Sequence, residues 1–181
     1  VDDMVEKVRE HVGEFVYSIN GEDLPQVVGR LLLEKKLTLS SAESCTGGLF
    51  ASSIIDVPGI SASFDRGLVT YSNRAKIEEL GVLRETLDRY GAVSEETARE
   101  MAEGLHRITE SDVCISVTGI AGPEGGSAEK PVGLVYIALH YNGETICKKI
   151  HMRNVGRAWN RNYAMLAMMS MIYRAISVFQ D

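Results

Sequence analysis

Ser44 is the first side chain in this sequence whose position suggests covalent chemistry. It lies in the turn Ala42-Glu43-Ser44-Cys45-Thr46-Gly47-Gly48, between an apolar run and a helical pattern. Small residues let the backbone approach a ligand closely, and the unpaired N–H groups of a helix N-terminus can hold an oxyanion. A serine there resembles a nucleophile elbow, although the sequence G-x-S-x-G is absent. The turn predicts a nucleophilic serine, with helix capping by Ser44 or Thr46 as the alternative.

Cys45 is a second candidate nucleophile in the same turn. A cysteine facing a strand-to-helix turn is more often a small buried apolar residue, because only an exposed thiolate is reactive. Both interpretations of Cys45 stay open at the level of sequence.

A serine nucleophile needs a base, and histidine is the usual one. The four histidines lie outside the glycine-containing turns, which disfavours a Ser-His-Asp triad: His11, His106, His140 and His151. Lys76 is the alternative base, because burial penalises the ammonium form and lowers the pKa of the amine. It follows an apolar run that ends on Tyr71 and Ser72. Taken alone, Lys76 is typical of a solvated helix lysine and Tyr71 of a half-buried strand residue.

A long glycine-containing segment, Thr118–Gly133, follows another apolar run. Long ordered loops in compact domains are usually functional, with a flexible surface loop as the alternative. The segment matches neither the Walker pattern nor G-x-G-x-x-G, so P-loop and Rossmann nucleotide sites are excluded. Arg157 and Arg161 form a further candidate site, because like charges at i and i+4 near a helix start break the local electrostatic rules. Such a pair can bind a phosphate, or an acidic surface partner.

Alternating strands and helices must position these residues. Apolar runs with strand character cover residues 37–42, 64–71, 113–118, 132–140 and 145–151, the last two joined by a hairpin turn at Asn142-Gly143. Helical patterns begin at Leu24 with Asp23 as N-cap, follow the 44–48 turn as far as about Pro58, and cover 73–80 and 94–108 with Ser94 as N-cap. The final helix places its apolar side chains on one face: Met165, Met168, Met169, Ile172 and Ile176.

This order predicts an α/β fold, a layered α/β/α domain with a mixed sheet and a glycine-rich active-site loop. Ligands of open α/β sheets usually bind outside the carboxyl ends of the strands. Ser44, Tyr71 and Thr118 follow or end three strands, so we expect their side chains at one site.

Composition limits the classes of function. With 181 residues and 45% hydrophobic residues, the chain is long enough for one domain with a core. A net charge of −6 leaves no broad basic field for nucleic acid. Three cysteines without a C-x-x-C pair argue against disulfides and structural zinc. No apolar stretch is long enough for a membrane span. We expect a soluble cytoplasmic protein, with residues 1–23 as a helix and linker and 24–181 as the domain.

Several sequence blocks together resemble the C-terminal domain of the competence/damage-inducible CinA family. They are Ala-Glu-Ser-Cys-Thr-Gly-Gly at 42–48, Val-Thr-Tyr-Ser-Asn at 69–73, Gly-Ala-Val-Ser-Glu-Glu at 91–96, Thr-Gly-Ile-Ala-Gly-Pro at 118–123 and Glu-Lys-Pro-Val-Gly at 129–133. The family includes amidohydrolases that convert nicotinamide mononucleotide to nicotinate mononucleotide and ammonia without a metal or cofactor. The resemblance implies this activity, a small nucleotide as the partner, and a homo-oligomer. In longer members an N-terminal domain linked to pyrophosphatase activity precedes the domain, and residues 1–23 look like the junction to it.

The resemblance also implies roles for individual residues. Ser44 would be the nucleophile, Lys76 the base with Tyr71 beside it, and Thr118 a companion hydroxyl near the oxyanion. The implied substrate-binding residues are Cys45, Thr46, Gly47, Gly48, Asn73, Gly119, Ala121, Gly122, Arg157 and Arg161. Two alternatives remain open, since family membership does not guarantee activity. One is an inactive nucleotide-binding or regulatory module attached to a pyrophosphatase-type domain, and the other is an oligomerisation module that uses the Met-rich last helix.

Overall fold

A five-stranded mixed sheet forms the centre of the molecule. The computed structural model describes residues 16–153 and 155–177, and the strand order is β2-β1-β3-β4-β5. Strands β1 (Leu39–Glu43), β2 (Phe64–Val69) and β3 (Val113–Gly119) are parallel, whereas β4 (Leu134–Tyr141) and β5 (Glu144–His151) continue the sheet as antiparallel strands. The predicted layered α/β fold with a mixed sheet is confirmed.

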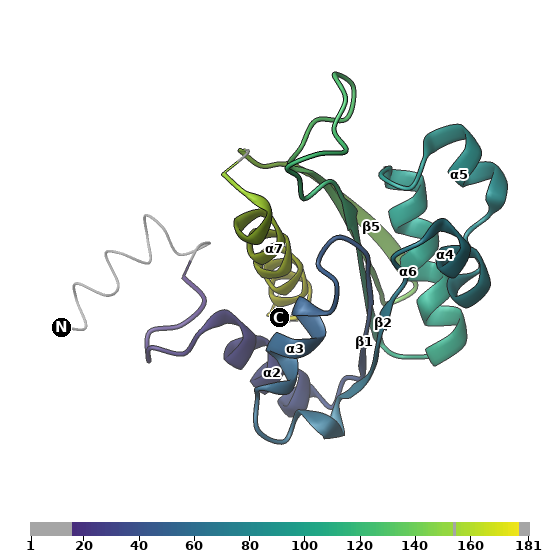
Figure 1. Ribbon diagram of the computed structural model, residues 1–181. Coiled ribbons are helices and arrows are strands. Elements are labelled where there is room, and N and C mark those ends of the chain that lie inside the picture. The colour runs from purple at the N-terminus through teal and green to yellow at the C-terminus, as the bar shows by residue number, and fades with distance from the viewer. Residues whose placement is uncertain (1–15, 154, 178–181) are drawn as a thin grey trace.

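Helices cover both faces of this sheet (Figure 1). One face carries α2 (Leu24–Lys35), α3 (Leu49–Ile55) and α7 (Arg157–Ser177), and the other carries α4 (Asn73–Leu80), α5 (Arg84–Tyr90) and α6 (Glu95–Thr109). The predicted apolar stripe of the last helix is buried, since Met168, Met169 and Ile172 are fully inaccessible to solvent. Each such side chain contributes about 1.5–3 kcal/mol when fully buried. The larger part of the core therefore lies between α7 and the sheet.

The predicted helix starts of α2, α4 and α6 are confirmed. The Asp23 carboxylate accepts from the Gln26 N–H at the start of α2, in a capping box with the Gln26 side chain. Ser94 accepts from the Thr97 N–H at the start of α6. These caps satisfy N–H groups that have no partner inside the helix.

The predicted hairpin between the last two strands is confirmed as well. Asn142 and Gly143 both have positive φ, 51° and 76°, as a two-residue type I′ turn requires. The dipeptide thereby fixes the register in which Tyr141 lies opposite Glu144.

Three strand boundaries differ from the predicted ones by two residues, and the others by at most one. β1 starts at Leu39 instead of residue 37, because the Thr38 N–H bonds to the Asp112 carboxylate instead of a neighbouring strand. β4 starts at Leu134 instead of residue 132, directly after Gly133 with φ 91°. β2 ends at Val69, so Tyr71 follows the strand and lies 61% exposed. The interpretation of Tyr71 as a half-buried strand residue was wrong.

Two short helices were not predicted. They are α5 and a single 3₁₀ turn at Ile60–Ala62. Neither has a side-chain cap, and the N–H of the α5 N-cap, Leu83, donates to Glu100 of α6. A helix of seven residues that depends on a partner from another helix leaves little periodic signal in its own sequence.

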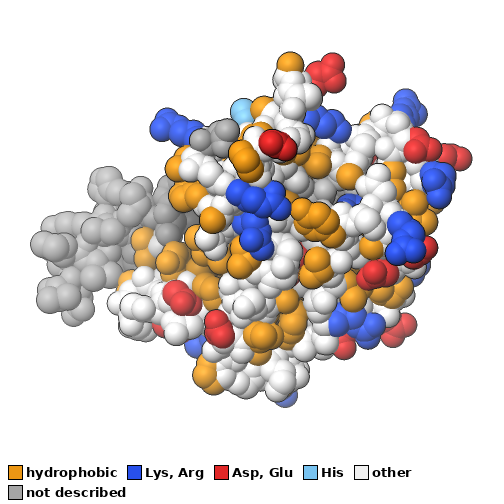
Figure 2. Space-filling view, in the orientation of Figure 1, with side chains coloured by type: hydrophobic (Ala, Val, Ile, Leu, Met, Phe, Trp, Pro, Cys, Tyr) orange, Lys and Arg blue, Asp and Glu red, His pale blue; other side chains and the backbone are white. Residues whose placement is uncertain are grey.

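Most of the predicted N-terminal helix lies outside the described residues. Residues 16–23 contain bends but no helix or strand. The division into a junction at 1–23 and a domain at 24–181 stays a prediction. Along residues 16–153 and 155–177, no helix is long and apolar enough to cross a membrane. Figure 2 shows basic and acidic side chains interspersed over the part of the surface formed by α4, α5 and α6.

Gly104 provides a test of how closely α6 packs against the end of α4. A Cβ at this position would lie well inside van der Waals contact of the Leu80 carbonyl oxygen. Helix propensity alone predicts that Gly104→Ala stabilises the protein by roughly 0.5–1 kcal/mol. Overpacking costs about 1–3 kcal/mol or more when backbone must shift. We therefore expect a net loss of stability, seen as a lower midpoint of urea denaturation.

Glu103→Ala is the matched control, because Glu103 is exposed on the same helix. Its stability should remain within about 0.5 kcal/mol of the parent. A Gly104→Ala protein as stable as the parent would show that α6 and α4 do not approach this closely.

Candidate active site

The segments that carry Ser44, Tyr71 and Thr118 meet at one edge of the sheet, as predicted. Because β1, β2 and β3 are parallel, their carboxyl ends lie together, and a cavity of about 210 Å³ opens there. The cavity is lined by Ser44, Cys45, Tyr71, Lys76, Ala92, Val93, Thr118, Gly119, Ala121 and Arg157. The fold thus joins the predicted serine, lysine, tyrosine and threonine in one pocket.

Lys76 is buried beside Ser44. Its Nζ donates to Ser44 Oγ at 3.1 Å and to the Thr70 carbonyl at 2.7 Å. The side chain is 1% exposed, so the alternative of a solvated helix lysine was wrong. Ser72 caps α4 by accepting from the Ala75 N–H and so places Lys76 in the first turn, directed at the end of β1. Within the described residues, no carboxylate forms an ion pair with Lys76.

Burial shifts the pKa values of Lys76 and Cys45 in opposite directions. Desolvation lowers the pKa of Lys76 to about 8, opposed by the nearby Cys45 sulfur. Desolvation also raises the pKa of the Cys45 thiol to about 12. Burial disfavours whichever form carries the charge. The neutral amine of Lys76 therefore becomes accessible near physiological pH, while Cys45 stays a buried, unreactive thiol.

Glu43 holds the turn that carries Ser44. Its carboxylate is fully buried and accepts from the N–H groups of Gly48, Phe50 and Ala51 at 2.9, 3.1 and 2.9 Å. The N-cap of α3 is Gly48, which has no side chain to cap the helix. The alternative that Ser44 or Thr46 caps this helix was therefore wrong, because a carboxylate from the preceding strand does so.

The sequence did contain a signal for Glu43. An acid at the end of a buried strand must find donors, and the N-terminus of the following helix offers them. Glu43 was nevertheless absent from the predicted site residues.

Side chains from three elements hold the opposite wall of the pocket. Ala92 and Val93 form this wall, and each of the four carbonyls of the segment Tyr90–Val93 accepts a side-chain hydrogen bond. Lys130 Nζ donates to the Tyr90 and Val93 carbonyls at 2.5 and 2.8 Å. The Gly91 carbonyl accepts from Ser94 and Thr97, and the Ala92 carbonyl from Thr118. Lys130 was another residue that sequence reasoning missed, and it links the wall to the segment that follows β3.

The two arginines of α7 bind backbone of the pocket loops. Arg157 donates to the Gly122 carbonyl at 2.8 Å and to the Tyr71 hydroxyl at 3.1 Å. Arg161 donates twice to the Thr46 carbonyl, from Nε at 3.2 Å and from Nη2 at 2.6 Å. Neither arginine pairs with an acid within the described residues. The alternative interpretation, that Arg157 and Arg161 pair with an acidic side chain on the surface, was therefore wrong for the described residues.

Six predicted substrate-binding residues are not among those that line the pocket: Thr46, Gly47, Gly48, Asn73, Gly122 and Arg161. Gly47 and Gly48 both have positive φ, and Thr46 is buried. Asn73 is exposed at the first position of α4.

Three of the histidines lie elsewhere: His106 stacks on His140, and His151 ends β5. His11 lies outside the described residues. No group of three or more His, Cys, Asp and Glu side chains is arranged to hold a metal ion in the described part of the chain.

A family profile described as the CinA C-terminal domain matches residues 21–176. The chain belongs to this family. CinA relatives include a CinA-like protein of Kosmotoga olearia, which is 48% identical over 170 residues, and a putative competence-damage inducible protein of Clostridium acetobutylicum, which is 48% identical over 176 residues. These alignments cover 94% and 97% of this chain but only 41% and 43% of the relatives. The chain thus spans less than half the length of these CinA relatives.

Solved CinA structures share the fold. The competence/damage inducible protein CihA of Agrobacterium tumefaciens is 40% identical, with a TM-score of 0.81 over 86% of this chain and 97% of that one. A CinA superfamily protein of Escherichia coli is 29% identical, with a TM-score of 0.82 over 91% of this chain and 98% of that one. The layered α/β arrangement is therefore the CinA arrangement.

A substitution at Glu43 tests whether its buried carboxylate holds the turn that carries Ser44. In Glu43→Gln the amide NH₂ replaces one acceptor oxygen, so at least one N–H of Gly48, Phe50 or Ala51 loses its partner. An unsatisfied buried donor costs about 1–3 kcal/mol. We expect urea denaturation to show a loss of this size. Glu34→Gln, at an exposed glutamate of α2, should change stability by at most about 0.5 kcal/mol. Equal losses in the two variants would contradict the clamping role of Glu43.

Proposed function

We propose that this domain hydrolyses the carboxamide of nicotinamide mononucleotide to nicotinate mononucleotide and ammonia, with Ser44 as nucleophile and Lys76 as base. The observation that carries the proposal is the buried 3.1 Å contact between Lys76 Nζ and Ser44 Oγ inside the pocket. The substrate is inferred from the CinA family, which includes amidohydrolases of this nucleotide. Desolvation of the lysine supports the role of a base, because a neutral amine can accept the serine proton.

In the first half of the proposed reaction, neutral Lys76 takes the proton of Ser44 Oγ as this oxygen attacks the carboxamide carbon. The tetrahedral intermediate then collapses, the C–N bond breaks, and the Lys76 ammonium returns its proton to the leaving nitrogen. Ammonia departs and an ester with Ser44 remains. In the second half, Lys76 accepts a proton from water as this water attacks the ester. The Lys76 ammonium then returns the proton to Ser44 Oγ, the C–O bond breaks, and the acid leaves. The balance is one amide and one water for one acid and one ammonia.

Within the 44–48 turn, elimination points to the N–H groups of Cys45 and Thr46 as the oxyanion donors. The Glu43 carboxylate occupies the N–H groups of Gly48 and the two residues after Leu49. The Gly47 N–H donates to the Ser44 carbonyl. Within residues 16–153 and 155–177, the N–H groups of Cys45 and Thr46 donate to no backbone carbonyl and face only the Cys45 sulfur, which is a weak acceptor. Preorganised backbone donors of this kind stabilise an oxyanion strongly because they need no reorganisation.

The size of the pocket supports a binding mode in which only one part of the substrate enters it. Pockets that enclose drug-sized ligands measure roughly 300–1,000 Å³, whereas this one measures about 210 Å³. The pyridine ring and carboxamide would enter, and the ribose phosphate would extend to the mouth. Arg157 lies there, held by Tyr71 and Gly122, and we assign it to the phosphate. Arg161 is bound to the Thr46 carbonyl through its guanidinium, which supports a role in holding the turn.

The hydrogen bond of Thr118 supports a positioning role. Its hydroxyl donates to the Ala92 carbonyl at 2.7 Å, and Ala92 lines the pocket. In the proposed mechanism Thr118 thus keeps the wall at the correct distance from Ser44.

Release of ammonia from nicotinamide mononucleotide tests the proposed function directly. The parent protein should release ammonia equally with and without a chelator, and Ser44→Ala should lose this activity by several orders of magnitude while still binding the nucleotide in calorimetry. Ser52→Ala, at an exposed serine of α3, is the matched control and should keep full activity. A folded parent protein that binds the nucleotide without releasing ammonia would contradict hydrolysis and indicate a binding or regulatory module.

The pKa of Lys76 predicts the pH dependence of this reaction. Because the folded-state pKa is lowered to about 8, kcat/KM should rise with pH up to about 8 and then level off as the amine becomes neutral. Lys76→Arg should be inactive at every pH, since a guanidinium stays protonated. The same shift should make stability rise with pH between about 8 and the ordinary lysine value, because the unfolded chain binds more protons there. A pH-independent kcat/KM between 6 and 9 would contradict Lys76 as the base.

A further inference from the structure

Asn160 is a buried polar side chain that the proposed reaction does not use. It lies in the first turn of α7, where its N–H donates to the Gly156 carbonyl, and it is 1% exposed. Its Nδ2 donates to the Ala121 carbonyl at 3.0 Å, whereas its Oδ1 has no hydrogen-bond partner in the described part of the chain. A carbonyl can only accept, so the amide nitrogen must be the atom that faces Ala121. The contact with Ala121 therefore fixes the orientation of the side chain.

Packing alone does not account for an asparagine at this place. Ala164, one turn further along α7, belongs to the main hydrophobic cluster, and an apolar side chain at position 160 would leave no amide to satisfy. A buried acceptor without a partner lowers the stability of the fold. Residues that break a local rule in this way are often retained for function. The bond to the Ala121 carbonyl is the contact that an apolar side chain could not make.

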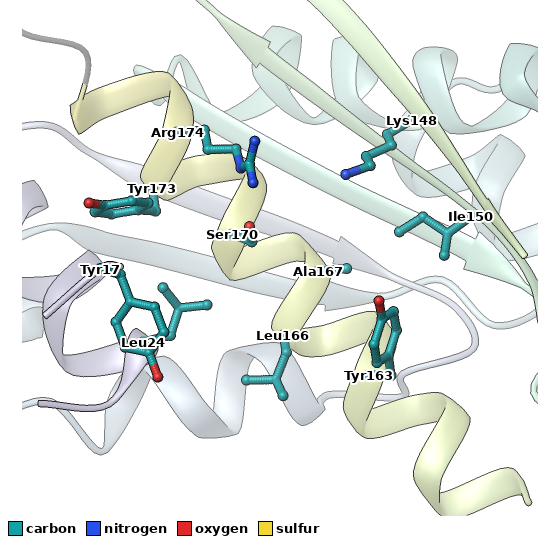
Figure 3. A pocket seen from close by; sticks show the side chains of 10 residues that line it. All are labelled: Tyr17, Leu24, Lys148, Ile150, Tyr163, Leu166, Ala167, Ser170, Tyr173 and Arg174. Atoms are coloured by element: carbon teal, nitrogen blue, oxygen red, sulfur yellow. The ribbon is translucent and has the colours of Figure 1, made fainter. Parts of the chain in front are cut away.

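The first turns of α7 hold the loops of the candidate active site. Arg157 and Arg161 each bind a loop carbonyl, and Asn160 between them binds that of Ala121. The later turns border a different hollow, a groove of about 410 Å³ that Figure 3 shows beside Leu166. The residues that line this groove and those that line the pocket have no member in common. The contacts of Asn160 thus belong to the pocket and not to the groove.

The peptide that precedes Ala121 has a definite direction. Its carbonyl, that of Ile120, accepts from the Gly133 N–H at 2.8 Å, directly before the start of β4. In a planar trans peptide the N–H points opposite to the carbonyl, so the Ala121 N–H points away from β4. The neighbour of β3 on that side is β1, and Ser44 follows β1 with its own N–H bonded to the Val117 carbonyl of β3 at 3.1 Å. The Ala121 N–H is thus directed to the side of the loop on which Ser44 lies.

This N–H group is available to a substrate. It donates to no acceptor among the residues that the structure describes, and Ala121 lines the pocket. The peptide that follows Ala121 is the one whose carbonyl Asn160 holds. Both peptides that flank the Ala121 Cα are therefore fixed, one by Gly133 and the other by Asn160. A donor that is fixed before the substrate arrives stabilises an oxyanion without reorganisation.

We propose that Asn160 is a positioning residue, which holds Ala121 so that its N–H serves as an oxyanion donor from the loop after β3. This inference rests on the function proposed above. In α/β-hydrolases the oxyanion hole combines the N–H that follows the nucleophile with an N–H from a separate loop. Here these are the N–H groups of Cys45 and Ala121. Asn160 is not among the residues that line the pocket and acts through Ala121.

Asn160→Ala tests this role because it removes the Nδ2 donor without adding a charge. We expect kcat for ammonia release from nicotinamide mononucleotide to fall roughly ten- to hundredfold, with little change in KM. The pH midpoint should stay at about 8, since Lys76 is unchanged. Asn162→Ala, at an exposed asparagine of the same helix, is the matched control and should keep the parent kcat.

A merely structural role of Asn160 gives a different result. It would lower the midpoint of urea denaturation and leave kcat of the folded fraction unchanged, and this outcome would overturn the proposal. If Asn160→Ala does not fold, Asn160→Asp keeps the shape of the side chain but lacks the donor. It is then compared with Asn162→Asp, and the same loss of kcat is expected.

Labelling of Ser44 separates this inference from the choice of substrate. With a small alkyl fluorophosphonate, Ser44 Oγ displaces fluoride from phosphorus, Lys76 takes the serine proton, and the phosphoryl oxygen occupies the oxyanion site. Intact mass spectrometry should show equal labelling rates for the parent and Asn162→Ala, and a rate about tenfold lower for Asn160→Ala. This difference would support the role of Asn160 even without release of ammonia from nicotinamide mononucleotide. Equal rates in the three folded proteins, or no labelling of Ser44 in the parent, would overturn the proposal.

Discussion

The candidate site depends on one unusual feature, a buried lysine that has no acidic partner among the residues that the structure describes. A buried ammonium is costly, and this cost lowers the pKa of Lys76 to about 8. In the described part of the chain, the acceptors around Lys76 are both neutral: Ser44 Oγ and the Thr70 carbonyl. A carboxylate at this place would restore the ordinary charge of the lysine and remove the basic amine. The burial of Lys76 beside Ser44, just after the end of β1, therefore also sets the chemistry of the site.

Backbone groups of the pocket loops are held by charged side chains from elsewhere in the chain. Glu43 binds three N–H groups of the turn after β1, Lys130 binds two carbonyls of the opposite wall, and Arg161 binds the Thr46 carbonyl. Loops lack the regular hydrogen bonds of helices and strands, so they need such partners to keep a fixed shape. Arg157 also binds a loop carbonyl, that of Gly122, but it lines the pocket, and we assign it to the substrate as well.

Much of the fold was predictable because its signals are local. Asp23 and Ser94 mark helix starts through their own hydrogen bonds, and Asn142-Gly143 fixes a hairpin through its backbone conformation. The buried apolar stripe of α7 follows from the spacing of its apolar residues alone. The α5 helix was not predictable in this way, since its start depends on Glu100 of another helix.

The sequence by itself determined the layered α/β fold and the gathering of Ser44, Tyr71 and Thr118, because parallel strands must end at the same edge of a sheet. It could not decide whether Lys76 is solvated or buried, since burial is a property of everything packed around the residue. Only the tertiary structure placed its Nζ beside Ser44 and gave the turn its carboxylate clamp, because contacts between distant segments depend on how the helices pack against the sheet.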